Sequence, residues 1–167
     1  MKNICVFGLG YIGLPTAAMF AHHGAKVVGV DVNPHAVETI NKGKIHIVEP
    51  GLEAIVKQAV DNNKLKASLT PVHSDAYLIA VPPPFKGDDH EPDLSYIQAV
   101  SKALAPLLEK GDVVILESTS PVGATEKMVE WLAEERTDLT FPKYHEPDIE
   151  ADIFVAYCPE RVLPGKV

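Results

Sequence analysis

Three glycines and an aspartate near the start of the chain have the spacing of a dinucleotide-binding site. Gly8, Gly10 and Gly13 follow the apolar run 4–7, and Asp31 follows Gly13 by 18 residues. In such a site the first glycine permits a tight turn, the second leaves room for a pyrophosphate, and the third lets the next helix pack closely. The start of that helix offers free N–H groups and partial positive charge to the phosphates. The aspartate accepts hydrogen bonds from the ribose hydroxyls of the adenosine.

The acid also predicts which dinucleotide binds. Asp31 would repel the 2′-phosphate of NADP, and residues 32–35 contain no arginine to receive that phosphate. Glycines at this spacing also serve ordinary turns, but here the strand, the helix and the acid all fall where the dinucleotide fingerprint requires them. The sequence therefore predicts NAD as the cofactor.

Rigid or polar segments follow later predicted strands, where ligands bind in a doubly wound sheet. After the strand 77–81, the prolines 82–84 form a rigid turn that either passes close to the cofactor or simply ends the strand. Thr119, at the tip of the next apolar strand, is the candidate to touch nicotinamide or a catalytic water. Ser120 and Thr125 lie at the start of the following helix, where hydroxyls serve as N-caps as well as ligands.

An acid and a base follow the last predicted strand, 153–157. Glu160 and Arg161 form either an exposed ion pair, which contributes little, or an acid near a reacting centre beside a guanidinium that binds a substrate phosphate. The seven histidines show no metal-ligand spacing, so the sequence predicts no metal site.

The elements that must hold these residues alternate between short apolar strands and helices. Asn33 is expected to cap the second helix, and Pro106 to end or kink the fourth. Segments 85–92 and 137–152 are expected to be loops. The alternation predicts an α/β fold, a doubly wound, mainly parallel Rossmann sheet with helices on both faces. Strands are expected at 4–7, 27–30, 65–69, 77–81, 113–116 and 153–157, and helices after Gly13 and at 34–41, 51–62, 95–108 and 123–135.

The composition is that of an ordinary one-domain globular protein. The chain has 167 residues, of which 46% are hydrophobic and 23% charged, and a net charge of −8. This charge argues against a general nucleic-acid binder, and no apolar run reaches the length of a membrane span. Cys5 and Cys158 are expected to be small buried hydrophobes inside strands, which together with the lack of a signal peptide predicts a cytoplasmic protein. The chain stops soon after a strand without a closing helix, which predicts a domain of a longer protein.

Together these segments resemble the nucleotide-sugar dehydrogenase family, which includes the UDP-glucose and GDP-mannose dehydrogenases. The family resemblance rests on GLGYIGLPTA at 8–17, VPPPF at 81–85, ESTSPVGATEK at 117–127 and YCPERVLPG at 157–165. The segment 157–165 is most similar to the bacterial UDP-N-acetyl-D-mannosamine 6-dehydrogenases, and so are two further segments, HIVEPGL at 46–52 and FKGDDHEPD at 85–93.

The resemblance implies that a sugar C6 alcohol gives two hydrides to two successive NAD molecules and becomes a carboxylate, for surface polysaccharide biosynthesis. In the family a cysteine captures the intermediate aldehyde, and the resulting thioester is hydrolysed. The resemblance assigns catalytic roles to Thr119 and Glu160, and contact with the UDP-sugar to Arg161 and Val162. It assigns NAD binding to Gly8, Gly10, Tyr11, Ile12, Gly13, Asp31, Pro83, Thr119 and Thr125.

The chain departs from the family's pattern at three points. Pro83 stands where a threonine is usual, and Pro164 stands where the UDP-glucose branch has a catalytic glutamate. The nucleophilic cysteine of the family lies in a Gly-Gly-x-Cys segment that these 167 residues do not contain, nor do they contain its partner lysine and asparagine. Cys158 sits in a different motif. We therefore expect residues 1–167 to bind NAD without turnover.

The family also implies a domain arrangement. In it, a dimerisation helix and a UDP-sugar domain follow the NAD-binding domain, so the full-length protein is expected to be a homodimer. Three alternatives stay open. The first is a stand-alone NAD-binding or sensor module without catalysis. The second is a dehydrogenase for a different nucleotide sugar, and the third is a β-hydroxyacid-type dehydrogenase with a similar Rossmann half.

Overall fold

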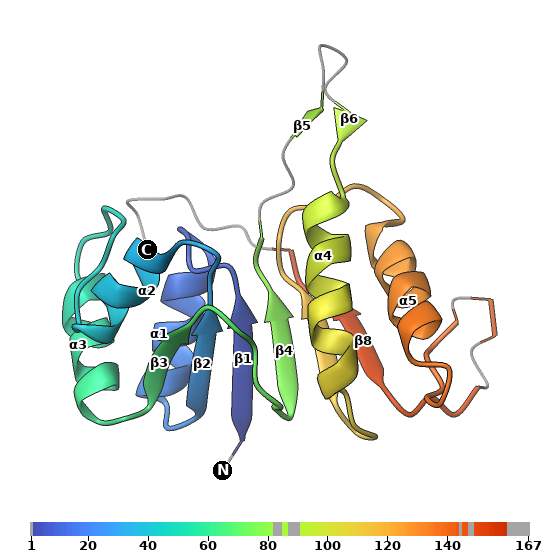
Figure 1. The fold of residues 1–167 in the computed structure, drawn as a ribbon, viewed down its shortest axis with the longest axis horizontal. Helices are drawn as coiled ribbons and strands as arrows, with labels where there is room; N and C mark the ends of the chain where they lie inside the picture. The colour runs from blue at the N-terminus through green and yellow to red at the C-terminus, as the bar shows by residue number, and fades with distance from the viewer. Residues whose placement is uncertain (1, 82–84, 87–90, 144, 147–148, 160–167) are drawn as a thin grey trace.

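One parallel sheet of six strands runs through the centre of the molecule, with helices on both of its faces (Figure 1). The computed structural model describes residues 2–81, 85–86, 91–143, 145–146 and 149–159. The strand order reverses between β1 and β4, which confirms the doubly wound Rossmann arrangement. In order across the sheet, the strands are β3 (Leu65–Ser68), β2 (Lys26–Val30), β1 (Asn3–Phe7), β4 (Ala76–Ile79), β7 (Val113–Leu116) and β8 (Phe154–Tyr157).

The helices divide between the two faces of the sheet because alternate residues of each buried strand point in opposite directions. Cys5 and Phe7 of β1 belong to a core that includes residues of α4 and α5, whereas Ile4 and Val6 belong to a core with residues of α1, α2 and α3. In Figure 1, α4 and α5 lie in front of the second half of the sheet. The helices are α1 (Gly13–His22), α2 (Pro34–Asn41), α3 (Leu52–Asp61), α4 (Ser95–Leu104) and α5 (Ala124–Glu135).

Two helix boundaries follow from single residues, as predicted. The side chain of Asn33 accepts a hydrogen bond from the His35 N–H at 3.0 Å and so caps α2, with Pro34 as the first helical residue. Pro106 lies in a short 3₁₀ turn, η1 (Ala105–Leu107), which directly follows α4. Because proline has no N–H and its ring disturbs the preceding turn, the α-helix ends at Leu104.

Two predictions about local structure are wrong. The segment 85–92 is not a plain loop, since β5 (Phe85–Lys86) pairs antiparallel with β6 (Glu91–Pro92), and this small hairpin projects from the carboxyl edge of the sheet (Figure 1). Cys158 is exposed and follows β8, so only Cys5 is a buried hydrophobe inside a strand. Burial raises the pKa of the Cys5 thiol to about 11, which keeps it protonated at neutral pH.

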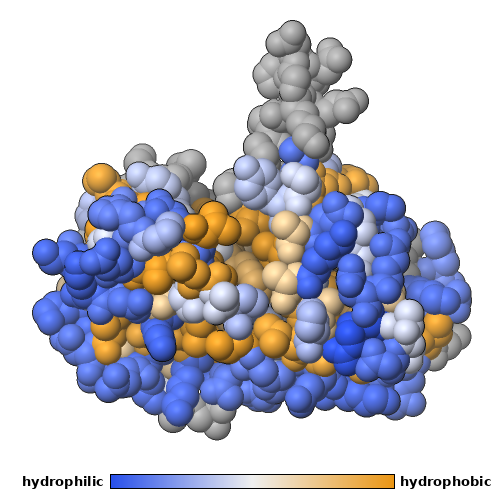
Figure 2. Space-filling model, in the orientation of Figure 1, coloured by the Kyte–Doolittle hydropathy of each residue, from blue (hydrophilic) through white to orange (hydrophobic). Residues whose placement is uncertain are grey.

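The surface seen in Figure 2 is hydrophilic over the outer sides of the helices. Apolar residues gather in the middle of this face, between α2 and α4. Among the described residues, no helix has both the length and the apolar character needed to cross a bilayer.

Arg136, directly after α5, ties two parts of the chain together. Its Nη1 donates to the carbonyls of Ala105 and Leu108, at 2.8 and 2.7 Å, and its Nε and Nη2 donate to Asp138 at 2.7 and 2.8 Å. These bonds anchor the end of α5 to the turn that closes α4. The guanidinium also lowers the pKa of Asp138 to about 2, so this carboxylate accepts the bonds at any pH well above that value.

We expect Arg136→Lys to lower the free energy of unfolding by about 1–2 kcal/mol, because an ammonium cannot bind both carbonyls and the carboxylate at once. Urea unfolding measures the change. Lys127→Met is the control, since Lys127 makes an exposed ion pair with Glu130 that contributes little. Equal stability of the two variants would contradict the anchoring role of Arg136.

Candidate functional site

The carboxyl ends of all six strands lie along one edge of the sheet, the upper edge in Figure 1. The chain reverses its direction of travel across the sheet between β1 and β4. In open sheets of this kind ligands bind at the carboxyl edge beside that reversal. The glycine-rich segment 8–13 lies there, between the end of β1 and the start of α1.

Packing requires two of the three predicted glycines. Gly8 has a φ of 85°, which favours glycine, and a Cβ there would come within 2.8 Å of the Ala80 carbonyl oxygen. A Cβ on Gly13 would overlap the carbonyl oxygen of Gly8. The loop and the first turn of α1 therefore touch backbone to backbone, beside the end of β4.

Gly10 differs from its two neighbours in the motif. A Cβ on Gly10 would meet no atom within 4 Å. The fold itself therefore does not demand a glycine at this position, although it leaves open space in front of it. This is what a site needs if a pyrophosphate approaches the backbone, so the loop fits the predicted dinucleotide.

The start of α1 is suited to bind an anion. The N-cap residue, Ile12, makes no capping hydrogen bond through its side chain, and the first hydrogen bonds of the helix run from Leu14 N–H to the Gly10 carbonyl and from Thr16 N–H to the Ile12 carbonyl. The amide groups before Leu14 point out of the helix start, where the helix dipole is positive. Tyr11 is 43% exposed at this position.

Asp31 has a structural role that the sequence did not reveal. Its Oδ2 accepts a hydrogen bond from the Leu9 N–H at 2.8 Å, and its Oδ1 accepts one from the Asn33 N–H at 2.9 Å. The carboxylate therefore holds the glycine loop to the end of β2. Each carboxylate oxygen has further lone-pair capacity, so the same group remains able to bind ribose hydroxyls.

Thr119 lies at the tip of β7, as predicted, and is exposed. The Ile79 carbonyl accepts hydrogen bonds from both the Glu117 N–H and the Ser118 N–H, which fixes this tip to the end of β4. Neither Ser120 nor Thr125 is the N-cap of α5. Gly123, with a φ of 89°, occupies that position, and Thr125 is half-buried in the first turn.

A buried acid at the same tip was missed in the sequence. Glu117 is 7% exposed, and its Oε1 accepts a hydrogen bond from the Thr16 hydroxyl of α1 at 2.8 Å. The two residues are 101 positions apart. The only signal in the sequence was an acid directly after a buried strand, which does not identify a partner on another element.

The remaining predicted site residues lie outside the described residues. These are Pro83, which follows β4 in the sequence, and Glu160, Arg161 and Val162, which follow β8. The backbone of Cys158 is described, and its N–H donates to the Leu116 carbonyl at 2.9 Å. The segment that leads to Glu160 thus leaves the sheet directly beside the tip of β7.

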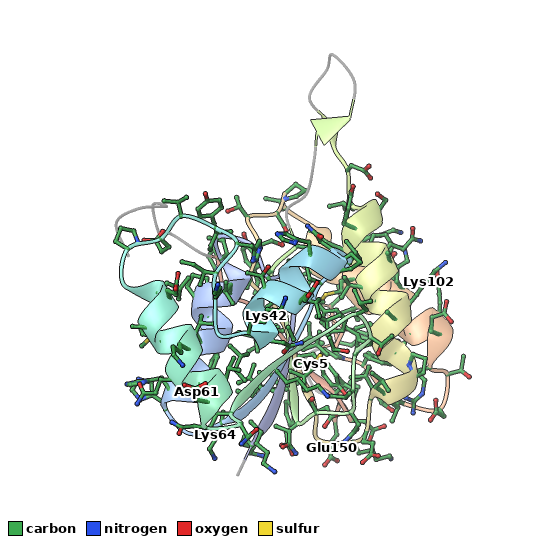
Figure 3. The ribbon with its side chains drawn as sticks, turned by 60° about the vertical axis from the view of Figure 1, so that its left-hand side comes forward. Cys5, Lys42, Asp61, Lys64, Lys102 and Glu150 are labelled. Atoms are coloured by element: carbon green, nitrogen blue, oxygen red, sulfur yellow. The ribbon has the colours of Figure 1, made fainter. Side chains whose placement is uncertain are left out.

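Other features of the chain lie away from this edge. In Figure 3, Cys5 lies inside the molecule, and Lys64 lies at the opposite end of the sheet. A cavity of about 380 Å³ is also found at that opposite end. Within the described part of the chain, no three histidine, cysteine or acidic side chains are grouped to hold a metal ion. The cavity is lined by Ala21, His22, Gly24, Gln58, Ala59, Asn62 and Lys64.

Comparisons with known proteins bear on this geometry. The sequence model described as "UDP-glucose/GDP-mannose dehydrogenase family, NAD binding domain" matches residues 2–167. The chain is 63% identical over 165 residues to the UDP-N-acetyl-D-mannosamine dehydrogenase of Escherichia coli (strain K12), a match that covers 99% of this chain and 39% of that protein. It is 57% identical over 166 residues to the NDP-N-acetyl-D-galactosaminuronic acid dehydrogenase of Ralstonia nicotianae, covering 99% of this chain and 38% of that protein.

A solved structure agrees with the fold. The UDP-N-acetyl-mannosamine dehydrogenase from Staphylococcus aureus matches with a TM-score of 0.88 and 40% sequence identity, over 99% of this chain and 38% of that chain. The chain therefore spans about two fifths of the length of the relatives it matches.

The glycine loop allows a matched pair of substitutions. We expect Gly13→Ala to lower the free energy of unfolding by about 3 kcal/mol or more, because the new methyl group meets a backbone carbonyl that cannot turn away. We expect Gly10→Ala to leave the thermal unfolding midpoint unchanged and to weaken NAD binding by about tenfold or more, since its methyl group enters only the open space. Calorimetric titration and thermal unfolding measure the two effects. Wild-type NAD affinity in Gly10→Ala would show that the cofactor does not approach this backbone.

Proposed function

The chain belongs to the UDP-glucose/GDP-mannose dehydrogenase family as its NAD-binding domain, and from this we propose that it provides the oxidant site of a UDP-N-acetyl-D-mannosamine 6-dehydrogenase. The reaction converts the C6 alcohol of the sugar, with two NAD⁺ and one water, to a carboxylate, two NADH and three protons. Its product, UDP-N-acetyl-D-mannosaminuronate, would serve surface polysaccharide biosynthesis. The open space at Gly10, between two glycines that packing requires, supports the NAD site. The 63% identity to the Escherichia coli UDP-N-acetyl-D-mannosamine dehydrogenase supports the choice of sugar.

The roles of individual residues follow from the geometry of the carboxyl edge. Gly10, Gly13 and the two residues between them present backbone N–H groups to the pyrophosphate. The Gly8 N–H instead donates to the Val30 carbonyl and so ties the loop to β2. Asp31 holds this loop through the Leu9 N–H and would accept hydrogen bonds from the adenosine ribose. NAD, when bound, accepts hydride at its nicotinamide ring. Thr119, exposed at the tip of β7, would contact the nicotinamide or a catalytic water, and Thr125 in the next helix would contact the cofactor or a water.

The family pattern carries the rest of the assignment. Glu160 would act as an acid beside the reacting sugar, Arg161 and Val162 would contact the UDP-sugar, and Pro83 would border the cofactor. The nucleophilic cysteine, with its lysine and asparagine, would come from outside residues 1–167. A homodimeric full-length protein and a cytoplasmic location remain predictions of the sequence.

One observation favours a second substrate. The Ralstonia nicotianae relative, 57% identical, is named for an N-acetyl-galactosaminuronic acid product. A dehydrogenase for a different UDP-N-acetylhexosamine is therefore the alternative.

We expect the full-length protein to produce NADH from UDP-N-acetyl-D-mannosamine faster than from UDP-N-acetyl-D-galactosamine or UDP-glucose, and residues 1–167 alone to bind NAD without producing NADH. Absorbance of NADH and calorimetric titration measure these outcomes. A higher rate with the galactosamine substrate would establish the alternative. Turnover by residues 1–167 alone would contradict the assignment of the nucleophile to another part of the protein.

We also expect NADH to bind at least about tenfold more tightly than NADPH, because the Asp31 carboxylate repels a 2′-phosphate. Asp31→Asn should reduce the ratio of NADH affinity to NADPH affinity. Val32→Ala should not, since Val32 is a neighbour that is 91% exposed and carries no charge. Fluorescence titration with both reduced cofactors gives the ratio. Equal affinities in the wild type would exclude this role for Asp31.

A further inference from the structure

Glu117 is a buried acid at the carboxyl edge of the sheet. Neither the dinucleotide fingerprint nor the family pattern gives it a role. We propose that Glu117 makes this site favour oxidised NAD⁺ over NADH, so that the reduced cofactor is exchanged between the two oxidation steps. The inference rests on the proposed function, because only a reaction that uses two NAD molecules in succession requires such an exchange.

Glu117 lies at the carboxyl edge of the sheet, close to the glycine loop. It directly follows β7, and its N–H donates to the Ile79 carbonyl at the end of β4. Ala80, the next residue of that neighbouring strand, is the one against which Gly8 and Gly13 pack. Glu117 therefore follows a strand that is separated from β1 and its glycine loop by β4, on the side opposite to Asp31.

The side of the sheet with β4 and β7 is expected to receive the nicotinamide half of the cofactor. In a doubly wound fold the dinucleotide crosses the reversal of strand order, with its pyrophosphate at the start of α1. Asp31, at the end of β2, defines the adenosine half. The nicotinamide half then lies over the ends of β4 and β7, where Glu117 and Thr119 are found.

The Glu117 side chain points toward α1. Its Oε1 is 2.8 Å from the Thr16 hydroxyl, which lies one helical turn after Ile12. The carboxyl group is thus held against the second turn of α1, and the residue is 7% exposed. Water therefore screens a charge at this position only weakly.

The oxidised and reduced cofactors differ in charge. The nicotinamide ring of NAD⁺ carries a positive charge, and that of NADH is neutral. A buried carboxylate beneath this half of the site attracts the first and not the second. The other contacts of the dinucleotide, at the glycine loop and Asp31, are the same in both states.

The proposed reaction requires that NADH be exchanged for NAD⁺ between its two oxidation steps. Removing two hydrides from one alcohol requires two NAD⁺, and each accepts one hydride. NADH must therefore leave and NAD⁺ must enter while the half-oxidised sugar stays bound. Release of a product often limits the rate of an enzyme. A site that binds NAD⁺ in preference to NADH speeds this exchange.

Three variants separate charge from structure. Glu117→Gln removes the charge but keeps an oxygen that can accept the Thr16 hydrogen bond. Glu117→Met removes the charge and the hydrogen bond together. Thr16→Val removes the hydrogen bond and keeps the charge. The full-length protein is titrated with NAD⁺ and with NADH by calorimetry, and circular dichroism verifies that each variant is folded.

We expect both neutral variants of Glu117 to weaken NAD⁺ binding about tenfold, the equivalent of about 1.4 kcal/mol, and to leave NADH binding unchanged. Thr16→Val should change both affinities by the same factor. Equal weakening of NAD⁺ and NADH in the folded Gln or Met variant would overturn the proposal and leave Glu117 with a structural role. If the wild type bound neither cofactor, the proposed function itself would fail, which is a different outcome.

Discussion

The first turn of α1 lies against the carbonyl of Gly8 so closely that no side chain fits between them. The rest of the site depends on this contact. It brings the start of α1 to the carboxyl edge of the sheet, and it places the loop beside Ala80 of the neighbouring strand. A close approach of backbone to backbone leaves the amide groups at the helix start directed outward, which is the condition for binding a pyrophosphate. One glycine therefore determines both a packing contact and an electrostatic site.

Two acids hold this loop and its helix from opposite sides. Asp31 binds the Leu9 N–H from the first half of the sheet, and Glu117 binds the Thr16 hydroxyl from the second half. Each hydrogen bond joins elements that are distant in the sequence. Under the proposals above, the same two groups would lie in the adenosine half and the nicotinamide half of the site, where each would also act on one end of the cofactor.

Much of this architecture could be predicted from the sequence, because the features concerned are local. The glycine spacing, the Asn33 cap and the end of α4 before Pro106 depend on residues within a few positions of one another. The features that were missed depend on distant partners or on weak local signals. The Glu117 carboxylate accepts its hydrogen bond from Thr16 on another element, and Asp31 accepts one from the Leu9 N–H, 22 positions earlier. The hairpin of β5 and β6 was hidden because its segment contains acids and a glycine, which are typical of loops.

The order of strands explains how motifs far apart in the chain form one site. β7 and β8 pair in register, with Leu116 opposite Tyr157, and the Cys158 N–H binds the Leu116 carbonyl. The segment that begins at Glu117 and the segment that begins at Cys158 therefore leave the sheet side by side. In the family pattern the first contacts the cofactor and the second the sugar. Under the proposed function, parallel pairing of the last two strands would bring the cofactor-binding and sugar-binding segments together at this edge.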